Sequence, residues 1–157
     1  MESTWIVASR WRGVIIALAL VLLGTALAAP PAGIEVQHAW VRWLPPGVPN
    51  TAMYGEIVNR TDREVRLIGG SSPVAEACAP MRTVRQHTGS PSGPEMAMET
   101  VPFLSVPAHG TLVLKPGGDH LMVMGLHPDW SADGTVDLTL HFEAAGDLSL
   151  SVAVAHR

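Results

Sequence analysis

Proline and glycine divide this chain into short segments, and this division limits the folds open to it more than any other feature. The 157 residues include 13 prolines and 15 glycines. Between them lie short runs rich in β-branched and aromatic residues, which is typical of strands. Proline has no backbone donor, so a segment such as 44–50 (LPPGVPN) connects strands instead of forming one. The pattern predicts an all-β domain.

The alternation of apolar and polar residues predicts where the strands lie. The segments 135–144 and 147–155 alternate most cleanly, and we expect them to form a hairpin across Ala145 and Gly146. Seven or eight short strands with frequent turns indicate an antiparallel β-sandwich. The expected strands are 34–43, 51–59, 64–70, 111–118, 120–126, 135–144 and 147–155.

Two segments carry specific expectations. Strict alternation along 34–43 places Ile34, Val36, His38, Trp40 and Arg42 on one face. The segment 73–80 (PVAEACAP) is the one stretch that favours a helical turn.

Residues 1–28 have the features of a secretory signal peptide. Arg10 and Arg12 precede an apolar stretch, and Ala26-Leu27-Ala28 fits a cleavage site after Ala28. An uncleaved anchor is the alternative, but the apolar run of about 17 residues is shorter than a spanning helix needs. No cysteine is available there for a lipid. We therefore expect a single domain over 29–157, exported to the periplasm, without a membrane span after cleavage.

Composition and motifs exclude several functions. Ten basic residues against 14 acidic ones provide no positive field for nucleic acid. The single cysteine excludes a disulfide framework and a cysteine-based zinc site. No nucleophile elbow, Walker loop, dinucleotide fingerprint or HExxH motif is present. We expect no catalytic residues and no enzymatic activity.

Methionine and histidine recur at strand spacing. His120, Met122 and Met124 would project from one face of their strand, with Leu121 and Val123 on the other. The same two-residue step occurs at Met96 and Met98, and His87 lies shortly before them. Methionine in a strand often only fills a core. Thioether and imidazole together, without carboxylate or thiolate, favour Cu(I) over Zn²⁺, Mg²⁺ or Ca²⁺.

The segment 115–126 (KPGGDHLMVMGL) resembles the signature of the periplasmic Cu(I) chaperone family PCuAC. That family's ligand pattern is His or Met, ten residues, Met, twenty-one residues, then His-x-Met. His87, Met98, His120 and Met122 fit each spacing. The resemblance covers nearly all of 34–155 and includes AWVR (39–42), GGSSPVAE (69–76) and the positions Asn50, Ala52, Tyr54 and Asn59.

The resemblance implies that His87, Met98, His120 and Met122 are Cu(I) ligands, with Met96 and Met124 as optional nearby thioethers. It implies a cupredoxin-like, Greek-key β-sandwich. It also implies delivery of copper to the binuclear centre of cytochrome c oxidase, through subunit II or an assembly factor. We expect a monomeric carrier.

One departure from the family leaves the first ligand open. The chain has about six additional residues between 69–76 and His87. Met81 lies nearer the expected distance from Ser71, whereas His87 has the expected distance from Met98. We favour His87. Cys78 lies in the added region and would offer a thiolate or, more often for a lone cysteine, be buried.

Three other functions are alternatives to this one. An exported copper storage or detoxification protein would use the same ligands. A β-sandwich interaction module would bind no metal. An electron-transfer blue-copper protein needs a cysteine with two histidines, and Cys78 lacks that grouping.

Overall fold

The computed structural model describes residues 31–86, 95–128, 130 and 134–156. These residues form an all-β fold, as the sequence predicts. The expected signal peptide, 1–28, lies outside the described residues. No helix capable of spanning a bilayer occurs in the described part of the chain. The strands are β1 (Ile34–Arg42), β2 (Asn50–Asn59), β3 (Val65–Ser72), β4 (Ala75–Gln86), β5 (Glu95–Thr100), β6 (Leu104–Val106), β7 (Thr111–Leu114), β8 (Asp119–Leu126), β9 (Thr135–Glu143) and β10 (Gly146–Ala155).

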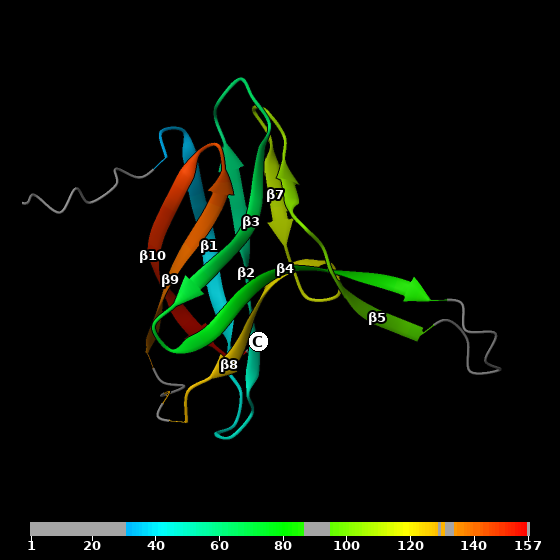
Figure 1. The fold of residues 1–157 in the computed structure, drawn as a ribbon, viewed down its shortest axis with the longest axis vertical. Helices are drawn as coiled ribbons and strands as arrows, with labels where there is room; N and C mark the ends of the chain where they lie inside the picture. The colour runs from blue at the N-terminus through cyan, green and yellow to red at the C-terminus, as the bar shows by residue number, and fades with distance from the viewer. Residues whose placement is uncertain (1–30, 87–94, 129, 131–133, 157) are drawn as a thin grey trace, which may run out of the picture.

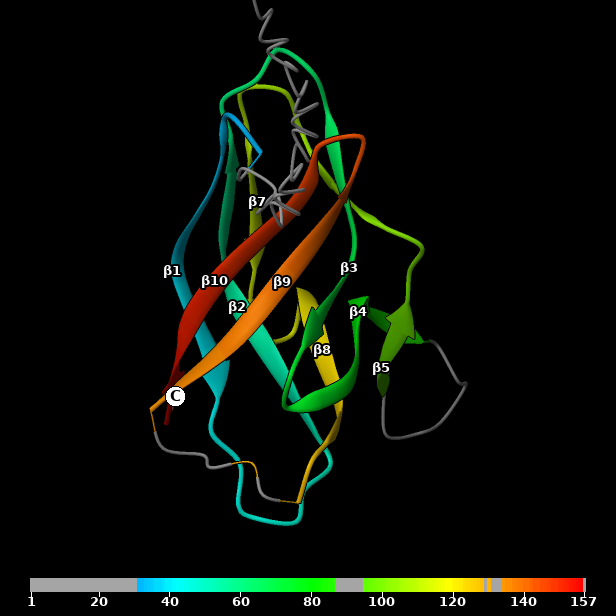
Figure 2. The same cartoon turned by 60° about the vertical axis from the view of Figure 1, so that its left-hand side comes forward.

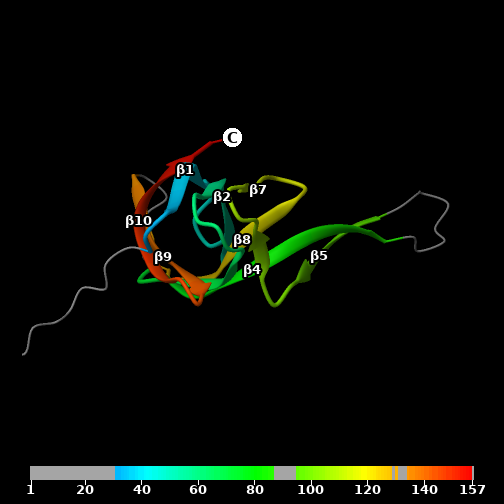
Figure 3. The same cartoon turned by 90° about the horizontal axis from the view of Figure 1, so that it is seen from above.

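The strands close into a flattened barrel. Neighbouring strands follow the order β4-β8-β2-β1-β10-β9-β3, and pairing of β3 with β4 completes the ring. Figure 3 shows this ring from above. Strands β5, β6 and β7 are added to it by pairing with β4, β3 and β2. The predicted antiparallel cupredoxin-like architecture is confirmed, with one parallel pair, β1 with β10.

A hairpin extends away from the barrel. Beyond its pairing with β8, β4 continues and pairs with β5, and both strands project from the body in Figures 1 and 2. Met98 lies on this hairpin, directly opposite Thr83. Although the hairpin projects, its Met98 lines a pocket together with His120 and Met122 of β8.

The core fills the inside of the ring with aliphatic side chains from most of its strands. Leu67 on β3, Leu121 on β8 and Leu140 on β9 are fully buried in one cluster. The predicted β9–β10 hairpin is confirmed, since Leu138 pairs with Leu150 and Leu140 with Leu148. This packing fixes which face of each strand is turned outward.

The expectation that 34–43 alternates strictly is wrong. The register of β1 against β2 shifts between Gln37 and Trp40, and His38 has a positive φ of 52°. This bulge reverses the alternation, so Val41 is fully buried in the core while Arg42 is exposed. Gly55 lies opposite, with a φ of 146°, and an added Cβ there would lie 2.9 Å from the Ala39 Cα.

The expected helical turn at 73–80 is also wrong. Only Pro73 and Val74 form a turn, and β4 begins at Ala75. The strand is held by β8, with Cys78 opposite Val123 and Pro80 opposite Leu121. The Pro80 carbonyl accepts from the Val101 amide at 3.1 Å. Pairing with β8 overrides the weak local preference of the segment.

Candidate metal centre

Strand β8 separates core residues from candidate ligands, as its alternation predicts. Leu121 and Val123 are fully buried in the core cluster. His120 and Met122 project from the opposite side and line a pocket outside the core. The outward face of β8 therefore presents an imidazole and a thioether two residues apart.

Three of the four predicted ligands line one pocket. Its volume is 220 Å³, and it lies on the outer face of β1, β2 and β8. Met98 reaches it from β5, although it is far from β8 in the sequence. The lining residues are Arg42, Leu44, Val48, Asn50, Thr51, Ala52, Tyr54, Met98, His120 and Met122. His87 lies outside the described residues.

The tautomer of His120 follows from its hydrogen bond. Its Nδ1 lies 2.9 Å from the Gly118 carbonyl oxygen. A carbonyl only accepts, so Nδ1 carries the hydrogen and donates, and Nε2 of the neutral ring keeps its lone pair. The residue is only 3% exposed. A buried imidazole with a fixed tautomer and a free lone pair on Nε2 is well suited to bind a metal.

Aromatic rings hold His120 in place. The Tyr54 ring centre lies 6.2 Å from the His120 ring centre, and the Trp40 ring centre lies 4.7 Å from that of Tyr54. Arg42 and Tyr54 line the pocket, although the sequence did not predict either residue at the site. The similar stretch 39–42 was the available signal, but its orientation depends on the bulge in β1.

The remaining methionines differ in their relation to the pocket. Met81 lies directly opposite His120 in the β4–β8 pair, so the two share a face. Met124 pairs with Ala77 and Asn50 and does not line the pocket. Met96 is 57% exposed and lies opposite Arg85 on the hairpin. Met81 is thus nearer His120 in register than either optional thioether.

Cys78 is turned away from these ligands. It belongs to the core cluster and lies opposite the buried Val123. Desolvation raises the pKa of its thiol from 9.0 to about 11. The expectation that this cysteine is buried is confirmed.

We predict that the Cys78 thiol is unreactive in the folded protein. The nucleophile is the thiolate, and at pH 8.5 a thiol with the raised pKa is ionised far less than an exposed one. Alkylation of native protein should be at least about a hundredfold slower than of urea-unfolded protein. Mass spectrometry of timed samples measures both rates, and rates within tenfold of each other would contradict this placement.

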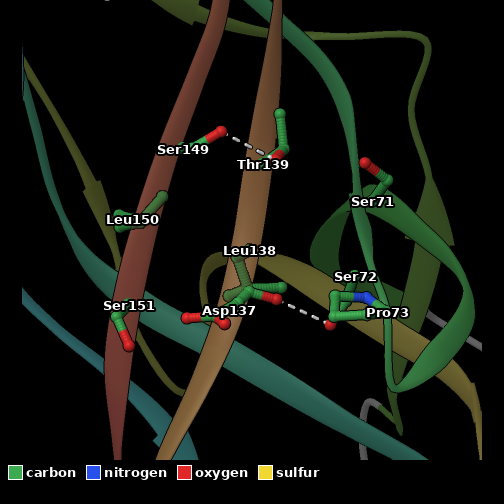
Figure 4. A pocket seen from close by; sticks show the side chains of 9 residues that line it. All are labelled: Ser71, Ser72, Pro73, Asp137, Leu138, Thr139, Ser149, Leu150 and Ser151. Atoms are coloured by element: carbon green, nitrogen blue, oxygen red, sulfur yellow. Dashed lines mark hydrogen bonds between the residues drawn. The ribbon is translucent and has the colours of Figure 1, made fainter. Parts of the chain in front are cut away.

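A larger hollow lies elsewhere and has different chemistry. It has a volume of 470 Å³ and lies across β3, β9 and β10. Figure 4 shows its hydroxyl groups, with Thr139 bonded to Ser149 at 3.0 Å and Ser72 donating to the Asp137 carbonyl oxygen at 2.7 Å. It contains no sulfur or imidazole among its lining residues. The soft donors are in the smaller pocket.

Solved structures share this barrel. The copper-bound PCuAC domain from PmoF2 is 22% identical, covers 82% of this chain and 97% of its own, and has a TM-score of 0.64. The Cu(I) form of DR1885 from Deinococcus radiodurans is 33% identical over 85% of this chain and 84% of its own, with a TM-score of 0.60. Its apo form is 30% identical, covers 100% of this chain and 97% of its own, and has a TM-score of 0.57. The fold is a PCuAC-type β-barrel, so the resemblance inferred from the sequence is confirmed.

The sequence comparison gives the family. Residues 34–154 match the family model described as "Putative lipoprotein LpqE-like". The "Putative lipoprotein Lxx21020" of Leifsonia xyli subsp. xyli is 30% identical over 122 residues, which are 78% of this chain and 69% of that protein. The chain belongs to the LpqE-like family.

Proposed function

We propose that this chain is an exported copper chaperone that binds Cu(I) through His87, Met98, His120 and Met122. The observation that supports it most is the convergence of Met98, His120 and Met122 on one pocket. Two similar structures were solved with copper, and one of them with Cu(I). A site of thioethers and imidazoles selects a soft monovalent ion.

The geometry favours a carrier over a permanent metal site. Met98 is 62% exposed and lies on the projecting hairpin, so one ligand is open to solvent. Neutral donors form no thiolate bond that must break on release. An acceptor can therefore replace the exposed thioether first and take the ion by stepwise ligand exchange.

The fourth ligand is proposed from spacing. His87 has the distance from Met98 that the PCuAC pattern requires. Met81 is the alternative, since it lies opposite His120 on the neighbouring strand. The two differ in donor type, nitrogen against sulfur, so counting the sulfur neighbours of bound copper distinguishes them.

Met98→Leu should weaken Cu(I) binding by about tenfold, since it removes one exposed donor of several while leucine keeps a similar volume. Competition against a colorimetric Cu(I) chelator measures this loss. Met96→Leu is the matched control, because Met96 lies two residues away on the same hairpin. The Cu(I) affinity of the Met96→Leu protein should stay within twofold of the wild-type affinity. Equal losses in both variants would contradict the assignment of Met98.

We propose export to the periplasm through the signal peptide, residues 1–28, and cytochrome c oxidase as the destination of the copper. The family and its relative are described as lipoproteins, which is consistent with export. The proposed acceptor is the binuclear copper centre in subunit II or an assembly factor that serves it.

A transfer experiment tests this function. Cu(I)-loaded protein is mixed without oxygen with the copper-free soluble domain of an oxidase subunit II, and the two are separated and assayed for copper. Copper should move from this protein to the acceptor faster than it moves to the acceptor from a Cu(I) chelator of equal affinity. Tight binding without transfer would contradict the chaperone role and favour storage or detoxification.

A further inference from the structure

The candidate copper pocket contains one charged side chain, and it is a cation. Arg42 lines the pocket together with Met98, His120 and Met122, and no carboxylate is among the described lining residues. The soft donors are neutral, so the guanidinium is the one formal charge among the described residues that line the pocket.

Arg42 is held close to the ligands. The Thr51 hydroxyl donates to the Arg42 carbonyl oxygen at 2.6 Å, which fixes the backbone where β1 ends. The guanidinium carbon lies 5.9 Å from the centre of the Tyr54 ring, on which His120 also packs. The bulge in β1 gives Arg42 this outward position.

The nearby acids do not neutralise Arg42. Among the described residues, Asp119 precedes His120, but its carboxylate accepts from Arg82 at 2.7 and 3.0 Å. In the register of β4 with β5, Glu99 lies opposite Arg82 and Met98 lies opposite Thr83. Neighbouring residues of a strand project from opposite faces, so Glu99 and Met98 lie on opposite faces of the hairpin. No ion pair joins Arg42 to any acid in the described ranges.

Repulsion between Arg42 and a bound ion increases with the charge of the ion. Coulomb energy is linear in charge, so a divalent ion loses twice the binding free energy that a monovalent ion loses at the same position. The affinity penalty of a divalent ion is then the square of the penalty of a monovalent ion. Neutral donors do not offset this difference.

We propose that Arg42 is a specificity-determining residue that disfavours the divalent ions Cu(II) and Zn(II) in the pocket relative to monovalent Cu(I). The inference depends on the proposed function, because it assumes that metal binds beside His120 and Met122. It adds a discrimination by charge to the discrimination by donor softness.

Two substitutions separate charge from size. Arg42→Gln removes the charge, and Arg42→Lys keeps it. Arg63→Gln is the matched control. Arg63 follows the last residue of β2, whereas Asn50 at the candidate copper pocket is the first, and Arg63 lines a different pocket. Thermal unfolding of each variant confirms that the fold is retained.

The experiment measures Cu(I), Ag(I), Cu(II) and Zn(II) affinities by competition with chelators. Arg42→Gln should raise both monovalent affinities by about threefold and both divalent affinities by about tenfold. Arg42→Lys and Arg63→Gln should match the wild type. The gain in Arg42→Gln should shrink at high salt, where surface charges are screened.

Other results overturn the inference in distinguishable ways. Equal gains for all four ions, no gain, or an Arg42→Lys that behaves like Arg42→Gln would refute charge selection while leaving Cu(I) binding intact. A wild-type protein that retains no Cu(I) would refute the proposed function itself, and the inference with it.

Discussion

Replacing His120 with alanine or Met122 with leucine should weaken Cu(I) binding by more than about a hundredfold. Both side chains project from β8 into the same pocket, and His120 presents Nε2 because Nδ1 donates to Gly118. Loss of a residue that merely supports a ligand costs tenfold to a hundredfold in metal affinity. Loss of a buried or partly buried ligand, unlike loss of the 62% exposed Met98, should cost more. Anaerobic competition with a Cu(I) chelator measures the change.

Met124→Leu is the matched control for Met122→Leu. Met124 lies two residues further along the same face of β8 but does not line the pocket. The substitution is the same, and leucine replaces methionine at little cost in stability. Cu(I) affinity in Met124→Leu should stay within twofold of wild type. A hundredfold loss in Met124→Leu, or unchanged affinity in both β8 ligand variants, would contradict the site.

Asn59→Ala should lower the free energy of unfolding by about 3 kcal/mol. Asn59 is 1% exposed, and its Nδ2 lies 2.7, 3.0 and 3.2 Å from the carbonyl oxygens of Arg63, Pro107 and Val106. Its Oδ1 accepts from the Thr61 amide and hydroxyl at 2.9 and 2.7 Å. Alanine would leave several of these groups without partners in a largely buried setting.

Urea unfolding followed by circular dichroism measures this loss as a lower midpoint at an unchanged slope. Ser149→Ala is the control, since its hydroxyl bonds only Thr139 on an exposed surface. That variant should lose less than about 1 kcal/mol. An Asn59→Ala protein as stable as Ser149→Ala would show that the buried amide does not hold the end of the barrel together.

Local patterns predicted the parts of the fold where alternation continues unbroken. The β9–β10 hairpin and the division of β8 into core and ligand faces follow from side chains that alternate without interruption. The convergence of Met98 with His120 and Met122 was predicted from the spacing of the PCuAC ligand pattern. No local sequence pattern predicts where a projecting hairpin lies relative to β8.

The failures occurred where tertiary pairing overrides local preference. Residues 75–80 form a strand because β8 supplies their partners. The bulge at His38 has no clear local signal, yet it reverses the faces of β1 and turns Arg42 toward the ligands. Gly55 lies opposite the bulge, and its φ of 146° and the 2.9 Å from an added Cβ to the Ala39 Cα require glycine there.

The most direct test of the central claim is the copper K-edge absorption spectrum of the protein loaded with Cu(I) without oxygen. The account predicts a Cu(I) edge and equal numbers of sulfur and nitrogen neighbours, from Met98, Met122, His87 and His120. Three sulfur neighbours and one nitrogen neighbour would indicate that Met81, and not His87, is the fourth ligand. A shell of nitrogen and oxygen without sulfur, or a protein that emerges free of copper, would contradict a thioether–imidazole copper site.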